Sequence, residues 1–204
     1  MTWHLNRIMW PVHNLGLGRR VGVWVQGCSL ACPGCVSESL WPAGGGSDTD
    51  VRRLAEWVVG QPDVDGVTVT GGEPFEQYAP LVAFAAYAKR LRPGLHVQVY
   101  SGFYLREIER RHPDRAYARV LDVLVDGRYV RQLHEDRNVR GSANQTHYRF
   151  EDGAPVPFEP PSPASVSVGV AATGDVYLAG IPRAGDLAHI TARLAEAGRP
   201  IAFE

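Results

Sequence analysis

The sequence alternates between short apolar runs and helix-forming segments, and this alternation constrains the fold more than any other feature. Apolar runs rich in β-branched residues occupy 21–26, 66–70, 96–100 and 120–125. Predicted helices follow the first three runs, at 51–58, 81–91 and 105–111. Strands that alternate with helices are joined by crossover connections, which leave the strands parallel. The pattern therefore predicts an α/β fold with a parallel sheet.

Loops of unusual composition follow these predicted strands, at 27–36, 71–74, 101–102 and 126–127. In parallel sheets with crossover helices, ligands bind beyond the carboxyl ends of the strands. The loops are therefore expected to meet at one edge of the sheet and to form the functional site there.

Charge and hydrophobicity exclude some classes of partner. With 21 Lys and Arg against 22 Asp and Glu, the formal net charge is -1, so no global positive field attracts nucleic acid or anionic lipid. No run approaches the roughly 18 to 20 apolar residues of a membrane span, and His4 and Arg7 interrupt the short apolar start. We expect a cytoplasmic protein without nucleic-acid or membrane partners.

All three cysteines lie in one loop, with the spacing Cys28-x3-Cys32-x2-Cys35. They are too few and too close for a disulfide framework, but three thiolates at this spacing can bind one iron-sulfur cluster. Because the sequence has no fourth cysteine, a four-iron cluster would keep one iron open to a substrate or cofactor. The spacing alone leaves other possibilities: a zinc site completed by His4 or His13, a redox pair of Cys32 and Cys35, or unligated thiols.

A glycine-rich loop, Gly71-Gly72-Glu73-Pro74, follows the predicted strand at 66–70. Glycines at a strand end let backbone polar groups approach a ligand, and the glutamate can accept hydrogen bonds from an ammonium group. A plain turn with a solvated acid can have the same sequence, so the interpretation depends on the cysteines that precede it. Together, the two loops fit one cofactor.

In order and spacing, the two loops resemble the signature of the radical S-adenosylmethionine (SAM) superfamily. Within it, the chain is most similar to the small activating proteins of glycyl-radical enzymes of the anaerobic ribonucleotide reductase type. The similarity rests on the blocks QGCSLACPGC at 26–35, TGGEPF at 70–75, VYSGF at 99–103, VLVDGRYV at 123–130 and RGSANQ at 140–145. Val36 and Ser37 depart from the aromatic residue and asparagine that often follow the last cysteine in this family.

The resemblance implies two groups of site residues. The implied ligands of a 4Fe-4S cluster are Cys28, Cys32 and Cys35. The implied cofactor-binding residues, which would hold SAM at the open iron, are Gly71, Gly72, Glu73, Ser101, Gly102, Asp126 and Arg140. Loop 71–73 would hold the methionyl amino group, and loop 101–102 the sugar or carboxylate side. Ser101 and Asp126 are also ordinary turn residues, with Asp126 suited to a type I′ turn, and Arg140 could instead tie the end of a barrel together.

The implied activity is reductive cleavage of SAM at the cluster to methionine and a 5′-deoxyadenosyl radical, with no side chain as general acid or base. The implied partners are an external one-electron reductant such as flavodoxin or ferredoxin and a glycyl-radical enzyme that receives the radical. Two other functions stay open. One is a stand-alone radical SAM enzyme acting on a peptide or small metabolite, and the other is a non-catalytic metal-binding interaction protein.

The fold implied by the resemblance is a partial, open (β/α)6-type barrel of about six parallel strands with a small C-terminal extension. We expect the radical SAM core at 1–152 and a proline-rich connector at 153–163, since proline disfavours helices and central strands. Residues 164–204 are expected to form the extension. Its expected elements are two hairpin strands and a helix, at 166–170, 176–178 and 187–197.

Overall fold

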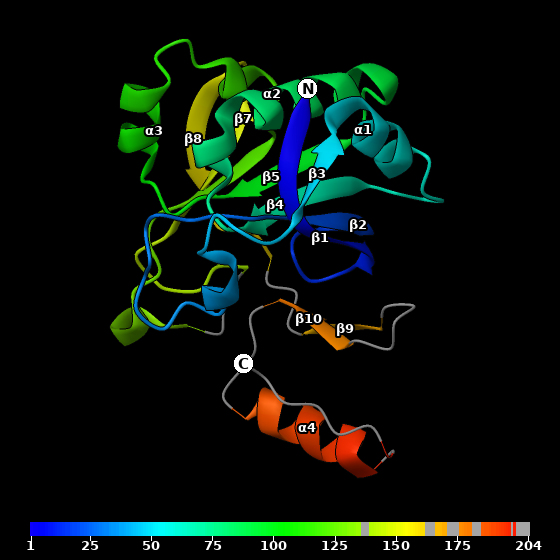
Figure 1. Ribbon diagram of the computed structural model, residues 1–204. Coiled ribbons are helices and arrows are strands. Elements are labelled where there is room, and N and C mark those ends of the chain that lie inside the picture. The colour runs from blue at the N-terminus through cyan, green and yellow to red at the C-terminus, as the bar shows by residue number, and fades with distance from the viewer. Residues whose placement is uncertain (136–138, 162–165, 171–175, 181–184, 197, 199–204) are drawn as a thin grey trace.

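The main element of the fold is an open, mixed sheet of eight strands in the order β3-β1-β2-β4-β5-β6-β7-β8 (Figure 1). The computed structural model describes residues 1–135, 139–161, 166–170, 176–180, 185–196 and 198. The strands of this sheet are β1 (Thr2–Val12), β2 (Arg20–Val25), β3 (Ser47–Asp50), β4 (Gly66–Gly71), β5 (His96–Tyr100), β6 (Val123–Asp126), β7 (Thr146–Glu151) and β8 (Ala154–Phe158). The helices are α1 (Val51–Val59), α2 (Tyr78–Leu91), α3 (Leu105–Arg111) and α4 (Asp186–Glu196). The predicted α/β class is confirmed.

Parallel pairing is confined to the central strands β2, β4, β5 and β6, whereas the pairs β3-β1, β1-β2, β6-β7 and β7-β8 are antiparallel. The expectation of about six parallel strands is therefore wrong. Loop 13–19 between β1 and β2 is too short for a crossover connection. Strands β7 and β8 are joined at Asp152 and Gly153, which both have positive φ (50° and 79°), as in a type I′ hairpin.

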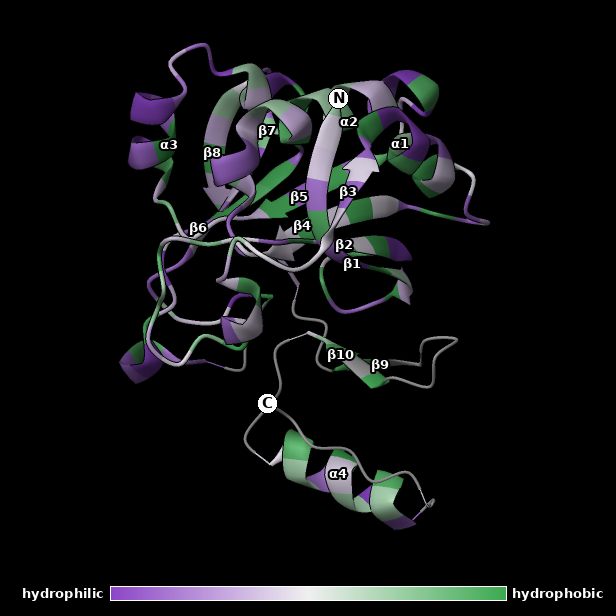
Figure 2. Ribbon diagram, in the orientation of Figure 1, coloured by the Kyte–Doolittle hydropathy of each residue, from purple (hydrophilic) through white to green (hydrophobic). Residues whose placement is uncertain are grey.

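Helices α1 and α2 cover one face of the sheet, and the hydrophobic core lies between them and the central strands (Figures 1 and 2). Alternate residues of β2, such as Val21 and Val23, are fully buried on this face. Helix α1 begins where the sequence predicted, because the Asp50 carboxylate accepts hydrogen bonds from the Arg52 and Arg53 N–H groups (3.0 and 3.1 Å). This packing fixes the ends of the parallel strands at one edge.

The opposite face of the central strands carries polar side chains. Arg20 of β2 is buried, and its guanidinium donates to Thr68 Oγ1 (2.6 Å) and to the Val67 carbonyl (2.7 Å). Burial lowers the pKa of Arg20 to about 10. Thr68 in turn donates to the Leu15 carbonyl (2.6 Å), so loop 13–19 is held against this face.

The proline-rich segment 153–163 does not lie wholly outside the sheet, as we had expected, because β8 forms within it. Its prolines explain the position of the strand. Pro155 and Pro157 have no N–H group to donate, and an edge strand tolerates this loss where a central strand would not.

The C-terminal extension forms the predicted elements. Strands β9 (Ser167–Val170) and β10 (Val176–Ala179) pair antiparallel, and α4 follows them. The residues between the two expected hairpin strands, 171–175, lie outside the described residues. Ala179 is buried against Trp24 and Leu40, and the Asn14 side-chain amide donates to the Ala179 carbonyl (2.5 Å). The hairpin is thus attached on the side of the sheet opposite α1 and α2 (Figure 1).

Candidate cofactor site

The cysteine loop leaves the carboxyl end of β2 and returns to it. Gly27 has a φ of 93°, and its N–H donates to the Leu40 carbonyl (2.9 Å) while that of Cys28 donates to the Trp41 carbonyl (3.0 Å). Within the loop, the Cys35 N–H donates to the Cys32 carbonyl (3.1 Å) and forms a turn. All three thiols are free and partly exposed. The loop therefore presents its cysteines at the sheet edge where the site was predicted.

The Gly-Gly-Glu loop lies directly against the start of the cysteine loop. The Gly72 N–H donates to the Val25 carbonyl (2.8 Å), and the Glu73 N–H donates to the Gly27 carbonyl (2.9 Å). A Cβ atom at position 72 would lie 2.1 Å from the Gly27 carbonyl oxygen, so any residue other than glycine would force the two loops apart. The glycine that sequence analysis selected for a close approach makes that approach to the backbone of the cysteine loop.

The carboxylate of Glu73 is buried and bound by three donors. It accepts hydrogen bonds from the Phe75 N–H (2.9 Å), the Ser101 hydroxyl (2.9 Å) and the Gly102 N–H (2.7 Å). Burial raises the pKa of Glu73 to about 7, and these hydrogen bonds oppose that effect. The glutamate thus ties the loop after β4 to the loop after β5.

Loop 101–102 completes the junction. The Ser101 hydroxyl also accepts from the Phe103 N–H (3.0 Å), and the Ser101 N–H donates to the Val125 carbonyl of β6 (2.8 Å). Position 102 contacts Leu30 of the cysteine loop so closely that a Cβ atom there would lie 2.4 Å from Leu30 Cδ1. The predicted meeting of the loops at one edge of the sheet is confirmed.

Asp126 and Arg140, two further predicted cofactor contacts, already have partners within the chain. The Asp126 carboxylate accepts from the Leu105 N–H (2.6 Å) at the start of α3 and from the Thr146 N–H (3.2 Å), and burial raises its pKa. Asp126 is the last residue of β6 and does not have the positive φ that a type I′ turn requires. Arg140 pairs with Glu135 (2.5 Å) and Glu159 (3.0 Å), so it joins the segments that follow β6 and β8.

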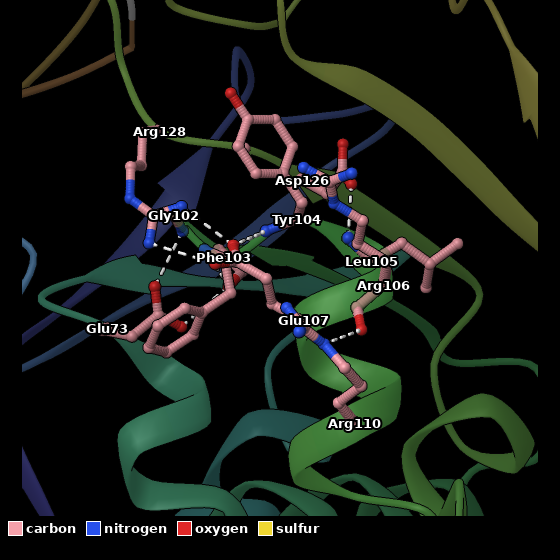
Figure 3. A network of polar contacts seen from close by, with 12 residues as sticks. Glu73, Gly102, Phe103, Tyr104, Leu105, Arg106, Glu107, Arg110, Asp126 and Arg128 are labelled. Atoms are coloured by element: carbon pink, nitrogen blue, oxygen red, sulfur yellow. Dashed lines mark hydrogen bonds and ion pairs between the residues drawn. The ribbon is translucent and has the colours of Figure 1, made fainter.

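Contacts that the sequence did not reveal surround the cysteine loop. Glu76 accepts hydrogen bonds from the backbone N–H (3.2 Å) and the hydroxyl of Ser29. On the other side, the Arg128 guanidinium acts to lower the pKa of Cys32 and forms an ion pair with Glu107 of α3 (2.8 Å) (Figure 3). Ser29 and Arg128 lie in blocks that carry the family resemblance, but their contacts could not be inferred from the sequence, and only the folded structure shows them.

The three thiols are a donor set that fits an iron-sulfur cluster. Burial raises the pKa of Cys28 and Cys32, so a metal would displace their protons on binding. In the part of the chain that the structure describes, no three His, Cys, Asp or Glu side chains are gathered around a metal position. His4, one of the two candidates for a fourth zinc ligand, uses both ring nitrogens on Asp48 (2.8 Å) and the Gly45 carbonyl (2.6 Å).

Comparison with known proteins defines the class. Residues 14–148 match the family described as 4Fe-4S single cluster domain, and the chain belongs to this family. It is similar to the anaerobic ribonucleoside-triphosphate reductase-activating protein of Pasteurella multocida, with 32% identity over 142 residues, covering 66% of this chain and 90% of the relative. The protein of the same name from Enterobacteria phage T4 is 30% identical over 146 residues, covering 68% and 88%. The pyruvate formate-lyase-activating enzyme of Listeria monocytogenes is 27% identical over 133 residues, covering 61% and 52%.

These matches confirm the resemblance to the radical SAM activating proteins, and the chain is an enzyme of this type. The cofactors that belong to this type are a 4Fe-4S cluster and SAM. No helix among the described residues is long and apolar enough to cross a membrane.

Proposed function

We propose that this protein cleaves SAM reductively at a 4Fe-4S cluster held by Cys28, Cys32 and Cys35. The observation that carries this proposal is the junction of the cysteine loop with Glu73 and Gly102 at one sheet edge. A cluster bound by three protein thiolates keeps one iron free of protein ligands, and the adjacent carboxylate and backbone groups suit the polar end of an amino acid.

Each loop has a distinct task in this proposal. Gly72 lets loop 71–73 lie against the cysteine loop, and Glu73 would accept a hydrogen bond from the ammonium group of SAM, whose positive charge favours the ionised carboxylate. Ser101 orients Glu73 through their hydrogen bond (2.9 Å). When bound, the cluster supplies the electron that breaks a carbon-sulfur bond of SAM and so gives methionine and the 5′-deoxyadenosyl radical. Asp126 and Arg140 act on this site through the segments that they hold.

We further propose that the radical takes a hydrogen atom from a glycyl-radical enzyme of the anaerobic ribonucleotide reductase type, with flavodoxin or ferredoxin as the electron donor. Support comes from the relatives that carry the name of its activating protein, of which the chain spans 90% in Pasteurella multocida and 88% in phage T4. In this proposal the open sheet of residues 1–152 is the partial barrel of a radical SAM core, and the protein acts in the cytoplasm.

A second candidate is a stand-alone radical SAM enzyme that acts on a peptide or small metabolite. The observation that favours it is the C-terminal extension, which lies beyond residues 14–148 that match the family. Its β10 strand is packed through Ala179 against Leu40, and Leu40 accepts the hydrogen bond of Gly27 next to the first cysteine. An extension attached there could shape a substrate site.

Deoxyadenosine formation under anaerobic conditions tests these proposals together. The reconstituted protein is supplied with SAM and dithionite, with and without an anaerobic ribonucleotide reductase. We expect deoxyadenosine in both samples and a glycyl radical signal in the electron paramagnetic resonance (EPR) spectrum of the sample with reductase. Deoxyadenosine without a glycyl radical would favour the stand-alone enzyme. The absence of deoxyadenosine would refute the proposed chemistry and favour a metal-binding interaction protein.

A further inference from the structure

A group of arginines extends from the cysteine loop to the outer side of α3. We call it the basic face, and its members are Arg106, Arg110, Arg111, Arg128 and Arg131. All are exposed except Arg128, which is half-buried. The chain as a whole has a net charge of -1, so this concentration of positive charge is local.

Contacts join the basic face to the cysteine loop. Arg131 packs beside Gly34, where a Cβ atom would lie 3.2 Å from the Arg131 side chain. The guanidiniums of Arg128 and Arg111 lie over the ring of Phe103 (6.0 and 4.2 Å to its centre). Phe103 directly follows Gly102, which contacts the cysteine loop. Figure 3 shows Arg106 and Arg110 on α3, and Arg128 on the other side of Phe103 and Tyr104 from the helix.

The acids nearest to the basic face leave most of its charge uncompensated. Glu107 pairs with Arg128 (2.8 Å), and Glu109 pairs with Arg115 (3.6 Å), which lies outside the face. Within the described residues, the remaining members form no ion pair within 4.0 Å; these are Arg106, Arg110, Arg111 and Arg131. Positive charge that is not paired with an acidic side chain suits an acidic surface on another molecule.

We propose that the basic face is the docking surface for an acidic one-electron carrier protein of the flavodoxin or ferredoxin kind, a proposal that rests on the proposed function. The carrier is oxidised by one electron and the cluster is reduced by one electron, so no proton or group transfer is needed. The carrier needs only to come close to the cysteine loop, and the basic face reaches this loop through Arg131.

The position of the face separates the two partners that the enzyme needs. Helix α3 lies on the same side of the sheet as α1 and α2, whereas the extension is attached on the opposite side (Figure 1). A carrier bound at α3 does not cover the side of the sheet to which the extension is attached. Attraction between opposite charges also raises the rate of encounter, and salt weakens this effect because it screens charges beyond about 10 Å at 0.1 M.

The test compares two charge-reversed variants after cluster reconstitution. Arg106→Glu with Arg110→Glu reverses two charges of the basic face, and neither residue belongs to the cofactor site. Arg52→Glu with Arg53→Glu reverses two exposed charges on α1, at the other end of the helical layer (Figure 1). The second-order rate constant for cluster reduction is measured with flavodoxin hydroquinone at low and high salt, and the dithionite rate is measured on the same samples.

At low salt we expect the α3 variant to react with flavodoxin about tenfold more slowly than the parent protein, with the difference shrinking at high salt. The α1 variant is expected to stay close to the parent, and dithionite is expected to reduce all three proteins equally. Equal flavodoxin rates for the two variants would overturn the proposal, as would a matching loss with dithionite. SAM cleavage driven by dithionite reports on the proposed function separately, because it needs no carrier.

Discussion

Replacing Glu73 with glutamine tests which physical effect controls the carboxyl group at the centre of the site. Burial acts to raise the pKa of Glu73, and three hydrogen bonds act to lower it. Burial prevails and raises the pKa from 4.5 to about 7. Glutamine has nearly the same shape and no ionisation, so Glu73→Gln removes the titration. Its NH2 group replaces one of the two acceptor oxygens and loses the hydrogen bonds made there, a cost that does not depend on pH.

The pKa difference gives the sign and the size of the effect. Because folding raises the pKa, the carboxyl group stabilises the fold fully below pH 4.5, and this contribution is lost as the pH rises through about 7. The complete loss amounts to about 3 kcal/mol. Between pH 5 and pH 8, the unfolding free energy of the parent relative to Glu73→Gln should therefore fall by about 2 to 3 kcal/mol.

Urea unfolding of the two metal-free proteins, followed by circular dichroism at several pH values, measures this difference. Other titrating groups are common to both chains and cancel in the comparison. A difference that is independent of pH, or that grows in favour of the parent as the pH rises, would refute the reasoning. It would mean that the hydrogen bonds from Ser101, Gly102 and Phe75 hold the carboxylate ionised in the folded protein.

Three further substitutions have defined outcomes. Gly72→Ala should destabilise the protein by about 1 to 3 kcal/mol in thermal unfolding, because its Cβ atom would lie 2.1 Å from the Gly27 carbonyl oxygen. An unchanged melting temperature would show that the two loops can separate freely. Asp126→Asn should lower the free energy of unfolding by about 1 to 2 kcal/mol and leave the SAM dissociation constant nearly unchanged. Weaker SAM binding with unchanged stability would show that Asp126 contacts SAM directly. Asp50→Ala should lower the melting temperature through the lost cap of α1 and leave deoxyadenosine formation per cluster unchanged. A loss of activity would contradict a purely structural role.

The centre of the site could be predicted from the sequence because it follows from strand direction. Once the runs at 21–26, 66–70 and 96–100 are recognised as parallel strands, the loops after them must meet at one edge. The order and spacing of the cysteines and Gly-Gly-Glu then carry the resemblance to the radical SAM superfamily, which implies the chemistry. Only backbone direction and residue type are needed for this step.

The outer strands could not be predicted in the same way. Strand β1 has no clean alternation of apolar and polar residues, and its pairing with β2 shifts register between Leu5 and Arg7 and again between Met9 and Val12. Strand β3 is the short polar run Ser47–Asp50. Strand β8 contains prolines, which are typical of loops, although the Asp-Gly pair at 152–153 was a usable hairpin signal.

The roles of the polar residues depend on donors that lie far away in the sequence. Ser101 was expected at the cofactor, and the structure directs its hydroxyl to Glu73, 28 residues earlier. Asp126 was expected at the cofactor, and its carboxylate accepts a hydrogen bond from the first N–H of α3. The positions of residues relative to the strands predict which residues lie at the sheet edge. Which groups they bind by hydrogen bonds depends on the packed structure.

The most direct test of the central claim is EPR spectroscopy of the reconstituted, reduced protein with and without SAM. The account predicts the signal of a reduced 4Fe-4S cluster, a change in that signal when SAM is added, and loss of the cluster in Cys28→Ala. A protein that holds zinc, or a cluster whose signal is indifferent to SAM, would contradict the claim that the cysteine loop and Glu73 bind one cluster-cofactor pair.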